Sequence, residues 1–204
     1  MEAHEAHEVG DHIAEEEAAH EAHAFRRLGG VILGIIAMLL AIASLLGEAA
    51  TKDTINFNIR ASDAFAFYQA KNERQSALQL ANAELMALLT SHPDWPSTGR
   101  ESVERLVEQN RATIARYESD PASGEGKKEL LAKARHFEEE RDRAQRRDLN
   151  YDYARAIFQI AIVLGSVSMV GSSRALLVLG CLLAGAATLL TANGVLLLVP
   201  LGFD

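Results

Sequence analysis

Long apolar stretches alternate with strongly polar ones along the chain. Residues 28–47 form a run of twenty residues without a charge, which as a helix is long enough to cross the ~30 Å hydrocarbon core of a membrane. Two further apolar runs, 156–173 and 175–201, are separated only by a short turn that holds Arg174. Because one straight helix cannot contain both, the pattern predicts a two-helix hairpin and three membrane spans in total.

Between the apolar runs, residues 50–155 have the pattern of three helices. Pro93 and Pro96 separate the first, at about 54–90, from the second, at about 98–118, where Thr98 and Glu101 have capping-box spacing. A Gly- and Ser-containing break precedes the third, at about 127–155. The first helix directly follows the apolar run at 28–47, so we expect the two to form one continuous rod. One face of this helix has mostly helical spacing with a polar interruption. That face consists of Phe57, Ala61, Ala64, Tyr68, Gln75, Leu78, Leu85 and Leu89.

These elements predict an all-α protein with one N-terminal transmembrane helix at 28–49 and a C-terminal transmembrane hairpin at 156–173 and 175–201. An extramembrane, coiled-coil-like helical domain at 50–155 lies between them. The tail at 1–27 is predicted to be a solvated helix or disordered, because its only large aliphatic residues before the first span are Val9 and Ile13.

The polar end of the third helix allows two interpretations. Glu139 with Arg143, and Asp142 with Arg146, have the i,i+4 spacing of ion pairs in a solvated helix. Alternatively, a patch made of Arg141, Arg143, Arg146 and Arg147 faces acidic lipid headgroups.

The net charge of −8 is concentrated in the tail. Residues 1–27 carry eight acids against Arg26 and Arg27, a net charge of −6, which leaves −2 for the rest of the chain. Nucleic-acid binding requires a concentrated basic surface, and the sequence offers none of sufficient size. The single cysteine, Cys181, excludes an intramolecular disulfide framework and zinc-type cysteine spacing.

The basic residues near the spans bear on orientation. Arg26, Arg27 and Arg174 lie on one side, and the other side holds seven: Lys52, Arg60, Arg141, Arg143, Arg146, Arg147 and Arg155. This bias places the middle domain in the cytoplasm by the positive-inside rule. The position of Arg26 and Arg27 directly at the first span argues for the opposite orientation.

The tail contains the clearest candidate metal ligands. On a helix, Glu16, His20 and His23 share one face, and this ligand set suits zinc, nickel or copper. Neighbouring carboxylates also raise histidine pKa values toward neutral pH, which suits a proton sensor. The alternative is a charged tail that only contacts water, because Ala and Glu residues provide no rigid second shell.

No set of residues indicates an enzyme. Cys181 lies within an apolar run with no histidine near it in sequence, and the segment around Gly124 and Gly126 lacks phosphate-loop spacing. The spans contain no acid, which disfavours a proton or ion pathway. Asn193 and Gly194 either break the last span locally or place an amide for an interhelical hydrogen bond. We therefore expect no catalytic residue, no cofactor and no small-molecule substrate.

The block ASDAFAFYQAK at 61–71 resembles the signature of a bacterial family, Domain of Unknown Function 4337, and the likeness extends along nearly the whole chain. Phe65 stands where that family often has tryptophan. The resemblance implies a multi-pass protein of the bacterial inner membrane with a helical middle, and it carries over no catalytic role. Phe65, Tyr68, Gln69 and Lys71 are the candidate partner surface, for a second copy or another membrane protein. The alternative is that these aromatics pack within the chain, near Phe137.

The sequence thus predicts a noncatalytic scaffold, accessory or oligomerisation protein that contacts the lipid bilayer. The alternative function is a sensor or accessory subunit that responds to metal or pH through the His/Glu tail.

Overall fold

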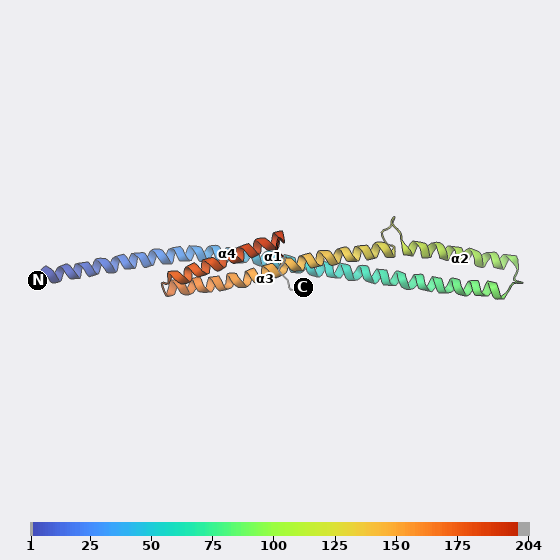
Figure 1. The fold of residues 1–204 in the computed structure, drawn as a ribbon, viewed down its shortest axis with the longest axis horizontal. Coiled ribbons are helices and arrows are strands. Elements are labelled where there is room, and N and C mark those ends of the chain that lie inside the picture. The colour runs from blue at the N-terminus through green and yellow to red at the C-terminus, as the bar shows by residue number, and fades with distance from the viewer. Residues whose placement is uncertain (1, 200–204) are drawn as a thin grey trace. The chain divides into compact units, whose positions relative to one another are not determined.

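A computed structural model describes residues 2–199, with the side chains of His20 and residues 23–199. These residues form four α-helices and no strand (Figure 1): α1 (Glu2–Ser91), α2 (Ser97–Glu118), α3 (Lys127–Val170) and α4 (Arg174–Leu196). The prediction of an all-α fold is confirmed. The chain divides into two compact units. The first, here called the apolar unit, is built from residues up to 52 and from 144 onward, and the helical unit comprises 53–143.

Three helices are long and apolar enough to cross a membrane: α1, α3 and α4. The sequence predicted that the first apolar run continues into the following helix as one rod, and the structure has a single helix from Glu2 to Ser91, which also includes the tail. The chain around Gly47 and Thr54 contains no proline, so nothing interrupts the backbone hydrogen bonds there.

In the apolar unit, α3 runs antiparallel to α1, and α4 runs antiparallel to α3. Gly29 of α1 lies against Met169 near the end of α3, and Gly47 lies against Tyr151 near the beginning of the apolar part of α3. A Cβ at Gly180 of α4 would lie 3.1 Å from the carbonyl oxygen of Ala161. Small residues thus let these helices approach closely.

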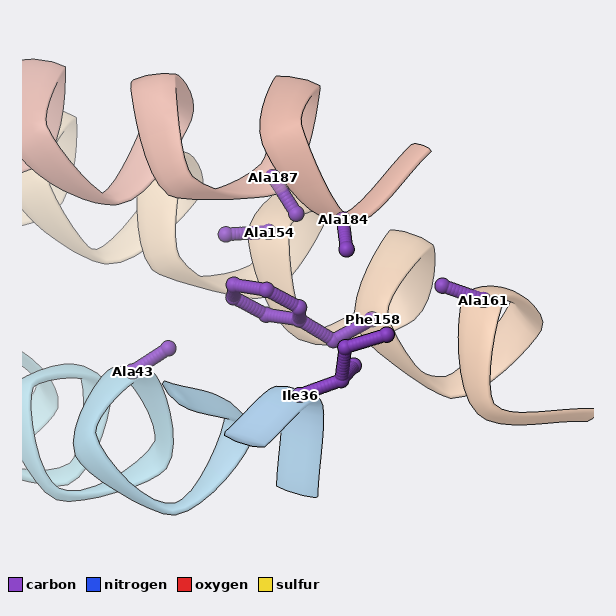
Figure 2. Packing of buried hydrophobic residues seen from close by; sticks show 7 residues of the cluster. All are labelled: Ile36, Ala43, Ala154, Phe158, Ala161, Ala184 and Ala187. Carbon is purple, nitrogen blue, oxygen red and sulfur yellow. The ribbon is translucent and has the colours of Figure 1, made fainter. Parts of the chain in front are cut away.

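The core of the apolar unit is made mainly of alanine around one aromatic ring. Phe158 of α3 lies among side chains of α1 and α4 (Figure 2) and is 1% exposed. The other buried members are Ile36, Ala43, Ala154, Ala161, Ala184 and Ala187.

The outside of the apolar unit carries the large apolar side chains. Met38 of α1, Val163 of α3 and Leu189 of α4 are exposed, Leu189 by 74%. The outside of this unit is therefore apolar, whereas a water-soluble helical bundle has polar residues on its outside.

In the helical unit, α1 packs against α2 and the beginning of α3. The face predicted from the sequence is buried or half-buried at every one of its positions, including Ala61, Ala64, Gln75 and Leu89. The Phe57 and Phe137 rings stack with centroids 6.4 Å apart. The face with helical spacing is thus the side of α1 that packs within the chain.

Two local predictions in the helical unit are wrong. Helix α2 begins at Ser97 with Pro96 at the N-cap and no side-chain cap hydrogen bond, so the capping box of Thr98 and Glu101 does not form. Proline fixes the backbone angle at the N-cap, which starts the helix one residue earlier than expected.

The second wrong prediction concerns the ion pairs in the charged part of α3. Arg143 pairs with Glu140, one turn before it, instead of with Glu139. Arg141 pairs with Asp142, the acid that was expected to reach Arg146. Both the i,i+3 and the i,i+4 neighbours of Arg143 lie within reach on a helix, and Arg141 and Asp142 are adjacent in sequence, so i,i+4 spacing alone does not select the partner.

Candidate functional site

The block at 61–71 lies on α1 in the helical unit, where α2 ends and α3 begins. Lys127, the first residue of α3, extends its ammonium group toward this block. Its Nζ donates a hydrogen bond to Oε1 of Gln75 at 2.7 Å and pairs with the Glu118 carboxylate at 3.3 Å. It also lies 5.7 Å from the centre of the Tyr68 ring. One ammonium group thus connects α1, α2 and α3.

Gln75 completes this cluster from the α1 side. Its Nε2 donates to the backbone carbonyl of Ile114 at 3.3 Å and to the Glu118 carboxylate at 3.2 Å. The Gln75 side chain is buried, so these bonds replace the water that it loses on folding. The polar interruption on an otherwise apolar face is therefore the point where the other two helices are held.

A second lysine has a similar arrangement one turn before Gln75. The Nζ of Lys71 lies 5.6 Å from the centre of the Tyr117 ring and 3.5 Å from the Glu125 carboxylate. Its side chain is only 17% exposed, so the cation–π contact acts with reduced competition from water. We call Tyr68, Lys71, Gln75, Tyr117, Glu118 and Lys127 the lysine junction.

The turn between α2 and α3 is tied to the junction by Glu129. Its carboxylate accepts hydrogen bonds from the Ser119 hydroxyl at 2.6 Å and from the Asp120 backbone N–H at 3.1 Å. The bond from Ser119 is the main cause that lowers the pKa of Glu129 below its ordinary value. Gly126 has no room for a side chain, because a Cβ there would collide with the Glu129 carboxylate and the backbone of Asp120.

Hydrogen bonds also lower the pKa of Glu118. The largest cause is the bond from Gln75, followed by the bond and the charge of Lys127. The junction thus holds Glu118 in its ionised form. These contacts are the kind that fix a helix in place, and they position the aromatic and basic side chains beside them.

Phe67 is the prominent exposed aromatic residue of the block. It is 64% exposed and lines a groove of about 360 Å³ between α1 and α3, together with Arg60, Lys133 and Phe137. It also lines an adjacent groove of about 230 Å³ beside Lys71. Apolar rings with nearby cations provide apolar and electrostatic contact for a partner segment.

Comparison with known proteins identifies the family of this chain. Residues 25–197 match the family described as a domain of unknown function (DUF4337). The chain belongs to this family. No curated protein and no solved structure matches it. The match extends over most of the two units of this DUF4337 chain, so the sequence resemblance is confirmed.

The structure separates the four residues predicted as a partner surface. Tyr68 and Lys71 join the junction inside the chain, Phe65 is half-buried, and Gln69 is exposed. Sequence reasoning missed Phe67, which lies off the apolar face of α1. The sequence signal that could have identified Phe67 is an aromatic residue that falls outside the face of α1 with helical spacing.

Of the predicted metal ligands, His20 and His23 are exposed on α1, and the Glu16 side chain lies outside the described residues. Within the described part of the chain, no group of three or more His, Cys, Asp or Glu side chains is placed to hold a metal ion.

Proposed function

We propose that this DUF4337 chain is a noncatalytic integral membrane protein that acts as a scaffold or accessory subunit. The apolar unit is its membrane anchor, and the helical unit is the contact module outside the membrane. The single observation that carries the proposal is the apolar outside of the apolar unit. Large apolar side chains such as Leu182, which is 67% exposed, cover this outside, and buried alanines with partly buried residues such as Leu39 and Leu183 form the inside.

The exposed apolar surface is stable in lipid and not in water. In water, the exposed apolar surface would be a strong aggregation liability, because it extends over three helices. In hydrocarbon the same surface needs no burial, and close packing of small residues holds the helices together. The proposed layout is one span within α1, a second within α3 and a third in α4.

Charges mark the ends of the proposed anchor. Arg26, Arg27 and Arg174 flank it at one end, and Lys52 and Arg147 flank it at the other. The second end also has Arg60, Arg141, Arg143, Arg146 and Arg155 near it, so we place this end, and with it the helical unit, on the cytoplasmic side of a bacterial inner membrane. The tail then lies on the opposite side.

The helical unit supports a binding role. The lysine junction fixes its three helices, and Phe67 with Arg60 and Lys133 forms an exposed groove beside the family block. A rigid helical module with such a groove suits recognition of another protein.

Membrane extraction tests the proposal. Membranes from cells that express the full chain are washed with alkaline carbonate, which strips peripheral proteins but leaves integral ones. We expect the chain to stay in the pellet and to be released only by detergent. Release of the chain by carbonate would overturn the membrane anchor.

A further inference from the structure

Helix α1 of the helical unit has a second face, opposite the one that packs on α2 and α3. This face consists of the positions from Ile55 to Ala87 that are alternately four and three residues apart. Every one of these positions is exposed, Ile55 by 56%, Ile59 by 53% and Leu80 by 63%. The other members of the series are Ser62, Ala66, Gln69, Glu73, Ser76, Ala83 and Ala87. We call this series of positions the outer seam.

From these observations we infer that the outer seam pairs with the outer seam of a second copy of this chain, as a parallel two-stranded coiled coil. The alternating four–three spacing is the repeat that keeps one side of a helix against a partner helix. This inference rests on the proposed function, because two copies anchored in one membrane present their helical units in the same direction.

The distribution of charge distinguishes the outer seam from the other surfaces of the helical unit. Between residues 54 and 90, α1 carries six charged residues in thirty-seven: Arg60, Asp63, Lys71, Glu73, Arg74 and Glu84. Helix α2 carries eight in twenty-two, and residues 127–143 of α3 carry eleven in seventeen. Surface helices in water normally have a strongly charged outer side, as α2 and α3 have. Helix α1 has a lower density of charge than these two helices, and within the outer seam only Glu73 is charged.

The flanks of the seam are complementary for a parallel pair. In such a coiled coil, the first heptad position, called a, is taken here by Ile59 and by every seventh residue after it. The residue just before each of these faces the residue five positions later in the partner. This rule places Asn58 opposite Asp63 of the second copy, and Gln79 opposite Glu84. Each pairs an amide donor with a carboxylate, and no like charges meet along the flanks.

Glu73 is the one charged residue in the seam itself. In a parallel pair it meets its own counterpart, and like charges that face each other across an interface weaken the association. Arg74, the next residue, is also exposed but lies outside the seam. The pair of substitutions Glu73→Leu and Arg74→Leu therefore separates a seam effect from a general increase in apolar surface.

The length of the seam indicates a weak contact on its own. Residues 55–87 span about 50 Å of helix, and a strip about 10 Å wide gives roughly 500 Å² per copy. Stable soluble complexes bury about 800 Å² per partner. Confinement of both copies to one membrane raises their effective concentration, so the seam suffices there.

Disulfide trapping in lipid vesicles tests the pair. The full chain with Cys181→Ala is reconstituted, with Ser62→Cys or Ser76→Cys in the seam, or with Ala112→Cys or Ala132→Cys on exposed positions of α2 and α3. Mild oxidation should yield dimers at both seam positions, with little dimer at the two control positions. Equal yields at all four positions, or no dimer in the seam, would overturn the pairing.

The Glu73 comparison supplies the second readout. Added to Ser62→Cys, Glu73→Leu should strengthen association by about tenfold, because it removes a repulsion and buries a leucine, whereas Arg74→Leu should leave it unchanged. Equal effects of the two substitutions count against the seam. Flotation of the same vesicles reports membrane insertion separately. A chain that floats without seam crosslinks contradicts only the pairing, and a chain that does not float contradicts the membrane anchor.

Discussion

The side-chain amide of Asn193 on α4 donates a hydrogen bond to the side-chain oxygen of Asn150 on α3, with 2.7 Å between the two atoms. Asn150 is 1% exposed and donates in turn to the backbone carbonyl of Arg146. Asn193 also exchanges two hydrogen bonds with the backbone of Val199. Of the two alternatives that the sequence left open for Asn193, the structure shows the interhelical bond, and α4 continues as a helix to Leu196.

Replacing Asn193 by leucine should weaken the apolar unit. The substitution leaves the oxygen of Asn150 without its donor, and an interhelical hydrogen bond in a membrane contributes about 1–2 kcal/mol at most. Thermal unfolding of the full chain in detergent micelles measures the change. Thr188→Val is the control, because the Thr188 hydroxyl bonds only to the Ala184 carbonyl of its own helix. Equal loss in both variants would contradict a special role for the Asn193 bond.

Replacing Lys127 by methionine should destabilise the helical unit. The change leaves the buried Oε1 of Gln75 without a donor, and an unsatisfied buried acceptor costs about 1–3 kcal/mol. Lys128→Met is the matched control, because Lys128 is the exposed neighbour of Lys127. Hydrogen exchange of residues 53–143 measures the local effect. Similar exchange in the two variants would show that the junction does not hold the three helices.

The helical unit should lose stability in acid. The hydrogen bonds of Glu118 and Glu129 hold the pKa of each carboxyl below its ordinary value. The unfolded chain therefore binds protons more readily than the folded chain, and the stabilisation is full above the unfolded pKa of about 4.3. It is lost as pH falls from there through the lowered folded pKa values.

Hydrogen exchange or circular dichroism as a function of pH measures this loss. The double variant Glu118→Gln and Glu129→Gln should be less stable at neutral pH and should depend less on pH below about 4.3. Glu104→Gln, at an exposed position of α2, serves as the control. An unchanged pH profile in the double variant would contradict the assignment.

A charge on the outside of the apolar unit should prevent membrane insertion. Met38 is exposed near the middle of the first apolar run, and an arginine at the centre of a span costs about 2.5–3.5 kcal/mol. We expect Met38→Arg to reduce the fraction of chain in the membrane. Leu106→Arg on α2, also an exposed apolar position, should leave that fraction unchanged. A fully inserted Met38→Arg chain would contradict a lipid-facing position.

Much of the architecture follows from the sequence, because helical spacing alone identified the face of α1 that the structure buries, even at its polar member Gln75. Spacing does not reveal contacts between distant segments. Lys71 was interpreted as part of a partner surface, and its neighbours Tyr117 and Glu125 come from α2 and the turn beyond it.

The outer seam could not be identified from the sequence either, because it depends on contacts between distant segments of the chain. A helix with only six charged residues in thirty-seven does not show which side its own chain covers. Only the packing of α2 and α3 on the side that holds Ala61 and Ala64 identifies Ile55, Ile59 and Leu80 as uncovered. The capping prediction at Thr98 failed for a local reason, because Pro96 begins α2 without a side-chain cap.

Thiol labelling in intact cells tests the central claim of a three-span anchor most directly. Single cysteines replace Ala24, Ser172 or Ser123 in the Cys181→Ala chain, and a membrane-impermeant reagent is added before or after the membrane is opened. Three spans place Ala24 and Ser172 on one side and Ser123 on the other. We expect the first two to react in intact cells and Ser123→Cys to react only after opening. Labelling of all three positions from the same side would contradict the three-span anchor.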